Sequence, residues 1–270
     1  GPPGAGKSTA LRNSGLNFPY ASKSGSAAVK GVGGTRNCDW WLTNEAVVLD
    51  TAGRWSTQEE DHDEWISFLG LLKRYRPRKP LNGLITAISI GDIAHAQEDE
   101  IESLATRMRE RLDEVQTQLR VSIPVYVLFT KCDLLEGFLE TFNELRRTDR
   151  NQVWGATLPL AKRPASLGDT VTDCLEELAQ VLEPRSLARM AEERSIPKRT
   201  KIYAFPQQFS AVKRNIAKFT SVMFQHNIYQ TMPALRGVYF TSGTQEGRPF
   251  NLLVNRLAEA LGSRQKTQSE

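Results

Sequence analysis

The spacing of apolar and polar residues changes several times along this chain, and each change predicts an element of structure. Between residues 97 and 119 apolar side chains recur every three to four positions, which predicts an amphipathic helix with one buried face. The segments "GLITAISI" (83–90) and "IPVYVLFT" (123–130) are apolar almost throughout, as buried strands of a parallel sheet are. The pattern therefore predicts helices that alternate with buried strands.

Weaker patterns predict the remaining elements. Two short strands, "RNCDWWLT" and "AVVLD", flank a turn at residues 44–45, and two later strands are predicted at "KIYAFP" (201–206), ended by its proline, and "GVYFTSG" (237–243). A glycine-rich segment at 15–34 predicts a mobile loop, and 146–167 is predicted to be irregular. Further helices are predicted at 7–13, 63–75, 138–145, 171–182, 212–223 and 249–261.

Strands that alternate with helices predict an α/β fold, with a mostly parallel sheet and helices on both of its faces. The core domain is predicted to comprise residues 1–136 and 200–245, with its first strand upstream of residue 1. A small helical subdomain is predicted over 137–199, because this stretch is longer than one crossover requires. Residues 246–270 are predicted to form a C-terminal helix and a disordered tail.

Composition changes this picture little, because 270 residues with 40% hydrophobic and 24% charged side chains are ordinary for a globular protein. No apolar run is long enough for a transmembrane helix, and the three scattered cysteines predict neither a disulfide framework nor a zinc site. The net charge is +4, and the densest basic cluster, "KRYRPRK" (73–79), is either a solvated loop or a surface for an acidic partner or anionic lipid. Nucleic-acid binding is not indicated, because basic and aromatic residues are not interleaved.

The segment "GPPGAGKS" at residues 1–8 fits the phosphate-binding pattern G-x-x-x-x-G-K-[ST] in full. Its glycines allow backbone N–H groups to point at a phosphate, and the helix that begins there adds its positive end. Lys7 is predicted to reach the β- and γ-phosphates, and the Ser8 hydroxyl to bind Mg²⁺. The residues predicted to contact nucleotide here are Gly1, Gly4, Ala5, Gly6, Lys7, Ser8 and Thr9.

Two further motifs predict a metal site. "AVVLD" ends in Asp50, at a strand end where an aspartate can hold Mg²⁺ directly or through water. Gly53 would let a backbone N–H approach a γ-phosphate. Thr35 is either a third ligand, which would make its loop a switch ordered by triphosphate, or a loop threonine that bonds its own backbone. The predicted metal ligands are Ser8, Thr35 and Asp50.

The sequence Thr130-Lys131-Cys132-Asp133 follows a predicted strand and fits [NT]-K-x-D. Asp133 can accept two hydrogen bonds that guanine donates and adenine does not, while Lys131 lies along the base. Thr130, Lys131 and Asp133 are the predicted base-site residues, and the three motifs in this order predict a P-loop, GTPase-like domain. A last base contact is predicted from "FPQQ" (205–208), which lacks the usual Ser-Ala and leaves ATP as an alternative to GTP.

Motifs spread over most of the chain resemble the nucleotide-binding region of the IcmF family, known as TssM in type VI secretion systems: "GPPGAGKSTAL", "GGTRNCDWW", "LDTAGRW", "FTKCDLLEGF", "QVWGATLP", "YAFPQQF" and "GVYFTSGTQEG". The resemblance implies a large bacterial inner-membrane protein with this region on the cytoplasmic face. It also implies other membrane-complex subunits and cytoplasmic baseplate proteins as partners. The region itself is not predicted to span the membrane.

Arg54 stands where a Ras-type switch has the glutamine that orients the attacking water, and arginine has no acceptor for that role. We expect Lys7, Thr35 and Arg54 to act in hydrolysis, with Arg54 against phosphate oxygens. The acidic residues 59–61 either position water or form the acidic start of a helix. Slow hydrolysis that gates or drives secretion-complex assembly is the first hypothesis. The alternative is a scaffold that docks partners, with nucleotide binding only structural or absent.

Overall fold

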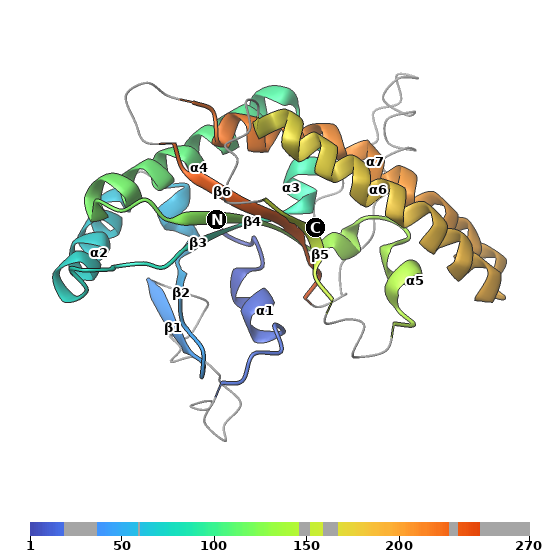
Figure 1. The fold of residues 1–270 in the computed structure, drawn as a ribbon, viewed down its shortest axis with the longest axis horizontal. Helices are drawn as coiled ribbons and strands as arrows, with labels where there is room; N and C mark the ends of the chain where they lie inside the picture. Colours follow the sequence, from blue (N-terminus) through green and yellow to red (C-terminus); the bar gives the residue numbers. More distant parts are fainter. Residues whose placement is uncertain (19–36, 59, 146–151, 159–166, 227–231, 244–270) are drawn as a thin grey trace.

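The computed structural model describes residues 1–18, 37–58, 60–145, 152–158, 167–226 and 232–243 (Figure 1). Within these residues the strands form a four-stranded sheet in the order β3-β4-β6-β5 and a separate two-stranded sheet, β1-β2. The smaller sheet consists of β1 (Cys38–Leu42) and β2 (Val47–Thr51). The larger one consists of β3 (Leu84–Ser89), β4 (Pro124–Thr130), β5 (Trp154–Thr157) and β6 (Ala234–Phe240). The fold is mixed α/β.

The larger sheet is mixed rather than purely parallel. β3 pairs parallel to β4 and β4 parallel to β6, so the carboxyl ends of these three strands meet at one edge. β5 pairs antiparallel to β6, in a stretch that was predicted to be irregular, so that prediction is wrong for its four residues. β1 and β2 form an antiparallel hairpin around the predicted turn. A strand upstream of residue 1 stays a prediction.

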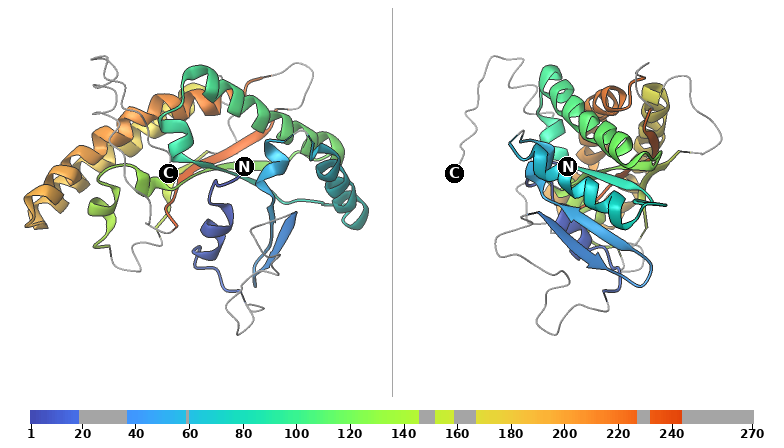
Figure 2. Two further views of the ribbon diagram at one scale, coloured as in Figure 1. Left: turned by 180° about the vertical axis from the view of Figure 1, so that it is seen from behind. Right: turned by 90° about the vertical axis from the view of Figure 1, so that its left-hand side faces the viewer.

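Helices α3 (Ile90–Ala94), α4 (Glu98–Leu119), α6 (Leu167–Glu192) and α7 (Ile196–Met223) lie on one side of the larger sheet (Figures 1 and 2). Helix α1 (Lys7–Arg12) and the β1–β2 hairpin lie on the other side. α2 (His62–Tyr75) packs against α4, and α5 (Phe138–Phe142) against α7. The helices predicted at 7–13, 63–75, 97–119 and 171–182 are confirmed. Most of the loop predicted at 15–34, from residue 19 on, and the helix predicted at 249–261 lie outside the described residues.

Helix α7 shows that the strand predicted at 201–206 is wrong. Its buried face recurs every three or four positions without a break: Ile202, Phe205, Phe209, Val212, Ile216 and Phe219. Pro206 removes one helical hydrogen bond, but it is buried within this face, where α7 packs against α6 and α4. Packing of the apolar face therefore outweighs the local preference of proline to end a helix. The helix predicted at 212–223 is the second half of α7.

The main core lies between the larger sheet and helices α4, α6 and α7. Val125, Val127 and Phe129, on one face of β4, are fully buried in it. α6 contributes Val171 to the same core, and the domain boundary predicted at residue 200 falls inside α7. An independent subdomain over 137–199 stays a prediction.

Candidate nucleotide site

The phosphate-loop segment folds into a turn that depends on its glycines. Gly4 and Gly6 both have φ of +71°, in the left-handed region that favours glycine. Gly53 begins the short 3-10 helix η1 (Gly53–Ser56) and lies against this turn, so that an added Cβ would stand 2.4 Å from the Pro3 nitrogen. The turn that follows β2 is therefore packed directly on the phosphate loop, with no room for a side chain between them.

The ammonium group of Lys7 is held by the loop itself. Nζ donates hydrogen bonds to the carbonyl oxygens of Gly1 and Pro2, each at 2.9 Å. Burial lowers the pKa of Lys7, and the nearby Asp50 carboxylate opposes that effect. The present partners of the Lys7 ammonium are therefore neutral carbonyl groups. An anion that entered the loop would bind it more strongly, because a charged acceptor forms a stronger hydrogen bond with an ammonium than a carbonyl does.

Two of the predicted metal ligands are in contact. Ser8, in the first turn of α1, donates from Oγ to Asp50 Oδ2 at 2.5 Å, although 42 positions separate them in the sequence. Asp50 lies near the end of β2 and is 3% exposed. A hydroxyl and a carboxylate oxygen are the type of ligand that Mg²⁺ prefers. The third predicted ligand, Thr35, lies outside the described residues.

The end of β4 connects the predicted phosphate loop, residues 1–8, to the predicted base motif, residues 130–133. Thr130 is buried, and its Oγ1 donates to the carbonyl oxygen of Ala5 at 2.7 Å. An added Cβ on Gly6 would lie 3.9 Å from Cε of Lys131, so the lysine stem passes beside the loop. Lys131 itself has φ of +57°, an uncommon conformation for a residue with a side chain. The structure thus brings Thr130 and Lys131 to the loop of residues 1–8, as the motif order predicts.

Asp133 has a partner that the motifs did not predict. It lies in the 3-10 helix η2 (Cys132–Leu134), is 3% exposed, and accepts a hydrogen bond at Oδ1 from Ser242 Oγ at 2.5 Å. Ser242 follows β6. The Thr241 amide donates to Phe129 O at 2.8 Å, and the Cys132 amide donates to Thr241 O at 3.1 Å. Backbone hydrogen bonds therefore fix Ser242 beside the base motif.

The segment that lies beside the end of β4 is 241–243, which follows β6, and not 205–208. Phe205 and Gln208 are fully buried inside α7, so "FPQQ" is not a loop at a strand end, and the prediction of a base contact there is wrong. Because a strand was predicted at 201–206, the next contact was expected at its end and not at Ser242. The signal was present in "GVYFTSG", where hydroxyl residues follow an apolar strand as Thr130 follows β4.

Arg54 contacts acidic side chains. Its guanidinium donates to the carboxylate of Asp61, to Glu64 Oε2 at 2.6 Å and to Asn37 Oδ1 at 2.8 Å. This network joins η1 to the start of α2 and to the residue before β1. Asp61 directly precedes α2, consistent with the acidic helix start expected for residues 59–61. A role for Arg54 in hydrolysis stays a prediction.

Comparison with known proteins places this chain in a family. A family model described as the IcmF-related N-terminal domain matches residues 58–270. The chain belongs to the IcmF-related family. It is 46% identical over 270 residues to the type VI secretion system component TssM1 of Pseudomonas aeruginosa, an alignment that covers 97% of this chain and 24% of that relative. No solved structure matches the chain.

This IcmF-related chain spans about a quarter of the length of the curated relative it matches. In the part of the chain that the structure describes, no helix is both long and apolar enough to cross a membrane. The same residues contain no group of three His, Cys, Asp or Glu side chains that could hold a metal ion. A cation beside Ser8 and Asp50 would therefore depend on further oxygen ligands, such as those of a phosphate.

Proposed function

We propose that this IcmF-related chain binds a nucleoside triphosphate with Mg²⁺, with GTP preferred over ATP. The observation that supports the proposal is that four segments far apart in the sequence contact one another around Lys7. They comprise residues 1–9, 50–53, 130–133 and 241–243, and the last three lie at the carboxyl ends of β2, β4 and β6. Ligands of α/β proteins bind at the carboxyl ends of strands, where loops of this kind converge.

Each part of the site fits one part of the nucleotide. Lys7 would exchange its two carbonyl partners for β- and γ-phosphate oxygens, which carry full charge. Ser8 and Asp50 would hold Mg²⁺, which when bound neutralises part of the phosphate charge. The left-handed turn at Gly4 and Gly6 supports the fit, because such turns point successive backbone N–H groups into one concavity.

Asp133 and Ser242 favour guanine. The Ser242 hydroxyl fixes one carboxylate oxygen of Asp133 by a hydrogen bond, which orients the carboxylate for a base. Guanine offers two neighbouring N–H donors to such a carboxylate. Adenine offers none in that position and would forgo these charge-assisted hydrogen bonds, at a cost of about 1–3 kcal/mol. ATP remains the alternative ligand if the base binds elsewhere.

We propose that hydrolysis is slow. Arg54 occupies the position of the water-orienting glutamine, it has no acceptor atom, and its donors bind Asp61 and Glu64. A partner that draws these carboxylates away would free the guanidinium for phosphate oxygens. Thr35 as a switch residue is part of the same proposal.

The family supports a role for this proposed function in a secretion machine. One relative is named a type VI secretion system component, so we propose that the chain acts at the cytoplasmic face of the bacterial inner membrane. Its partners would be membrane-complex subunits and baseplate proteins, and nucleotide binding would gate or drive their assembly. The alternative is a scaffold, which one observation favours: Lys7, Ser8 and Asp133 each have hydrogen-bond partners within the protein, so their pairing does not require a nucleotide.

Titration calorimetry with GTP and with ATP, each with Mg²⁺, tests the proposal. Wild-type protein should prefer GTP, and Asp133→Asn should weaken GTP binding by about tenfold or more while it favours xanthosine triphosphate. Asp173→Asn, an exposed aspartate on α6, is the matched control and should change nothing. Equal GTP and ATP affinities unchanged by Asp133→Asn would indicate a site that reads only phosphate, and no binding would leave the scaffold.

A further inference from the structure

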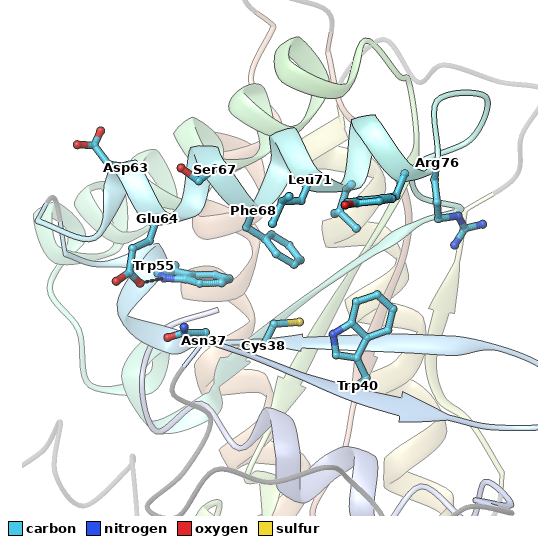
Figure 3. A pocket seen from close by; sticks show the side chains of 12 residues that line it. Asn37, Cys38, Trp40, Trp55, Asp63, Glu64, Ser67, Phe68, Leu71 and Arg76 are labelled. Carbon is cyan, nitrogen blue, oxygen red and sulfur yellow. Dashed lines mark hydrogen bonds between the residues drawn. The ribbon is translucent and has the colours of Figure 1, made fainter.

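A groove of about 790 Å³ lies between strand β1 and helix α2, apart from the proposed nucleotide site (Figure 3). Cys38 and Trp40 project into it from one face of β1, and Phe68 and Leu71 project from α2 toward them. None of the residues that line it belongs to β2 or β3. β1 is the only one of the described strands that contributes to the lining.

Large apolar side chains are exposed along this groove. Trp40 is 48% exposed, Leu71 53% and Tyr75 75%. A second stripe of α2, which includes Trp65 and Leu69, is already buried in a small core with α4. α2 is thus apolar on two sides, and within the described residues only one of them is covered. Exposed apolar residues that gather in one place commonly mark an interaction surface.

One end of the groove carries two carboxylates, Asp63 and Glu64, while the Cys38 thiol beside Trp40 is neutral. Burial raises the pKa of the Cys38 thiol to about 12, so the thiol stays protonated and behaves as a small apolar group. Glu64 closes one end, where its carboxylate accepts hydrogen bonds from Arg54 and from the Trp55 indole. This end of the groove is therefore acidic in part, and it would disfavour acidic side chains of a partner there.

The other end of the groove is strongly basic. Arg76 lines it directly, and four more basic residues surround that end of α2: Lys73, Arg74, Arg78 and Lys79. All five are exposed. Charge of one sign at the rim of an apolar surface selects partners of the opposite sign and speeds their encounter.

We propose that this groove binds an acidic amphipathic helix of another protein. Apolar side chains one helical turn apart would pack between Trp40 and Leu71, and acidic side chains at one end would lie beside Arg76. A bilayer fits less well, because the apolar groups line a concave groove between two walls, whereas membranes bind protruding apolar faces. The proposal does not depend on nucleotide binding.

Photo-crosslinking in cells that contain the intact secretion system tests the proposal. The full-length protein would carry benzoylphenylalanine in place of Tyr75 and, as a control, in place of Tyr203, which is 57% exposed on α7. We expect the Tyr75 position alone to capture a protein segment that is amphipathic and rich in Asp and Glu. Arg76→Glu with Lys79→Glu should reduce the yield of that adduct several-fold.

The captured segment is then synthesised, and its affinity for the protein is measured by fluorescence anisotropy. Leu71→Ser should weaken binding about tenfold, because it truncates a side chain at the centre of the groove. Leu187→Ser, on an equally exposed leucine of α6, should have no effect. A lipid adduct, a basic segment, a second copy of this chain, or equal capture at both tyrosine positions would overturn the proposal.

Discussion

The proposed nucleotide site and the groove beside β1 are neighbours, yet their side chains are satisfied in opposite ways. In the proposed nucleotide site the polar side chains of Lys7, Ser8 and Asp133 already have protein partners: Lys7 has two carbonyl oxygens and Asp133 has Ser242. In the groove the exposed Trp40 and Leu71 have no comparable cover among the described residues. Polar side chains can satisfy one another by hydrogen bonds within the protein. An exposed apolar surface lowers its free energy only when another surface covers it and removes it from water.

This difference predicts two kinds of binding energetics. A nucleotide would exchange existing hydrogen bonds for stronger, charged ones, so its affinity would depend on a few atoms. A partner in the groove would gain mainly from apolar area removed from water, so its affinity would be spread over several side chains, with charge acting on specificity.

Lys7→Ala should have the largest effect on binding. Loss of one charged donor to phosphate costs about 2–3 kcal/mol, which corresponds to roughly a hundredfold weaker triphosphate binding. Lys213→Ala, which removes a partly buried lysine of α7 that pairs with Glu176, is the control and should leave affinity unchanged. Calorimetry with GTP and Mg²⁺ gives the comparison, and wild-type affinity in Lys7→Ala would contradict the proposed phosphate site.

A pair of glycine substitutions should separate the two regions by their effect on stability. In Gly53→Ala the added Cβ would stand 2.4 Å from the Pro3 nitrogen, so overpacking should cost about 1–3 kcal/mol. In Gly70→Ala, on α2, the Cβ would meet nothing within 4 Å, and the gain in helix propensity should stabilise the protein by about 0.5–1 kcal/mol. Denaturant unfolding measures both, and equal signs would contradict the packing described.

Ser242→Ala should have a smaller effect that is confined to the base. Removal of a hydroxyl that orients Asp133 should weaken GTP binding about three- to fivefold and leave the phosphate contacts intact. GTP affinity and inorganic triphosphate affinity, measured side by side, would show whether only the first changes. A parallel loss of both would mean that Ser242 supports the whole site rather than the base contact.

The smallest effect concerns pH. Because burial lowers the pKa of Lys7 below its ordinary value of 10.5, the unfolded chain holds a proton there that the folded chain has lost, over the interval between the two values. Over that interval, which lies below pH 10.5, the contribution of Lys7 to folding stability should increase with pH, while triphosphate affinity should fall. Unfolding of wild type and Lys7→Met across the interval isolates this residue, and a difference that moves the other way would contradict it.

The elements that the sequence predicts well are those with a long, regular apolar pattern. The α4 pattern extends over 22 residues and gives nearly correct boundaries. β5 has only four residues, one of them a glycine, so neither alternation nor composition marks it as a strand. At 201–206 a proline and a short alternating pattern favour a strand locally. Only the longer apolar repeat from Ile202 to Phe219, with one residue every three or four positions, indicates a helix. Packing of that buried face against neighbouring helices stabilises it.

The strand wrongly predicted at 201–206 also limits how much of the site the sequence predicts. The motif order groups these segments, and the structure places Ser8 against Asp50 and Thr130 against the loop of residues 1–8, because strand ends converge whatever the details of the sheet. The last contact, from Ser242, could not be placed, because it requires knowing which strand follows β4 in the sheet. That order depends on contacts between residues more than a hundred positions apart, which periodicity along the chain does not report.

Helices α6 and α7 have a mechanical consequence of their own. They contain 26 and 28 residues, pack side by side and run past the end of the sheet (Figures 1 and 2). At about 1.5 Å per residue each is roughly 40 Å long. Such a pair is a lever arm: a rotation of about 5° at the sheet would displace its tip by about 3 Å. A pair of distance probes, one at the tip and one on β4, would therefore magnify small movements of the sheet into measurable ones.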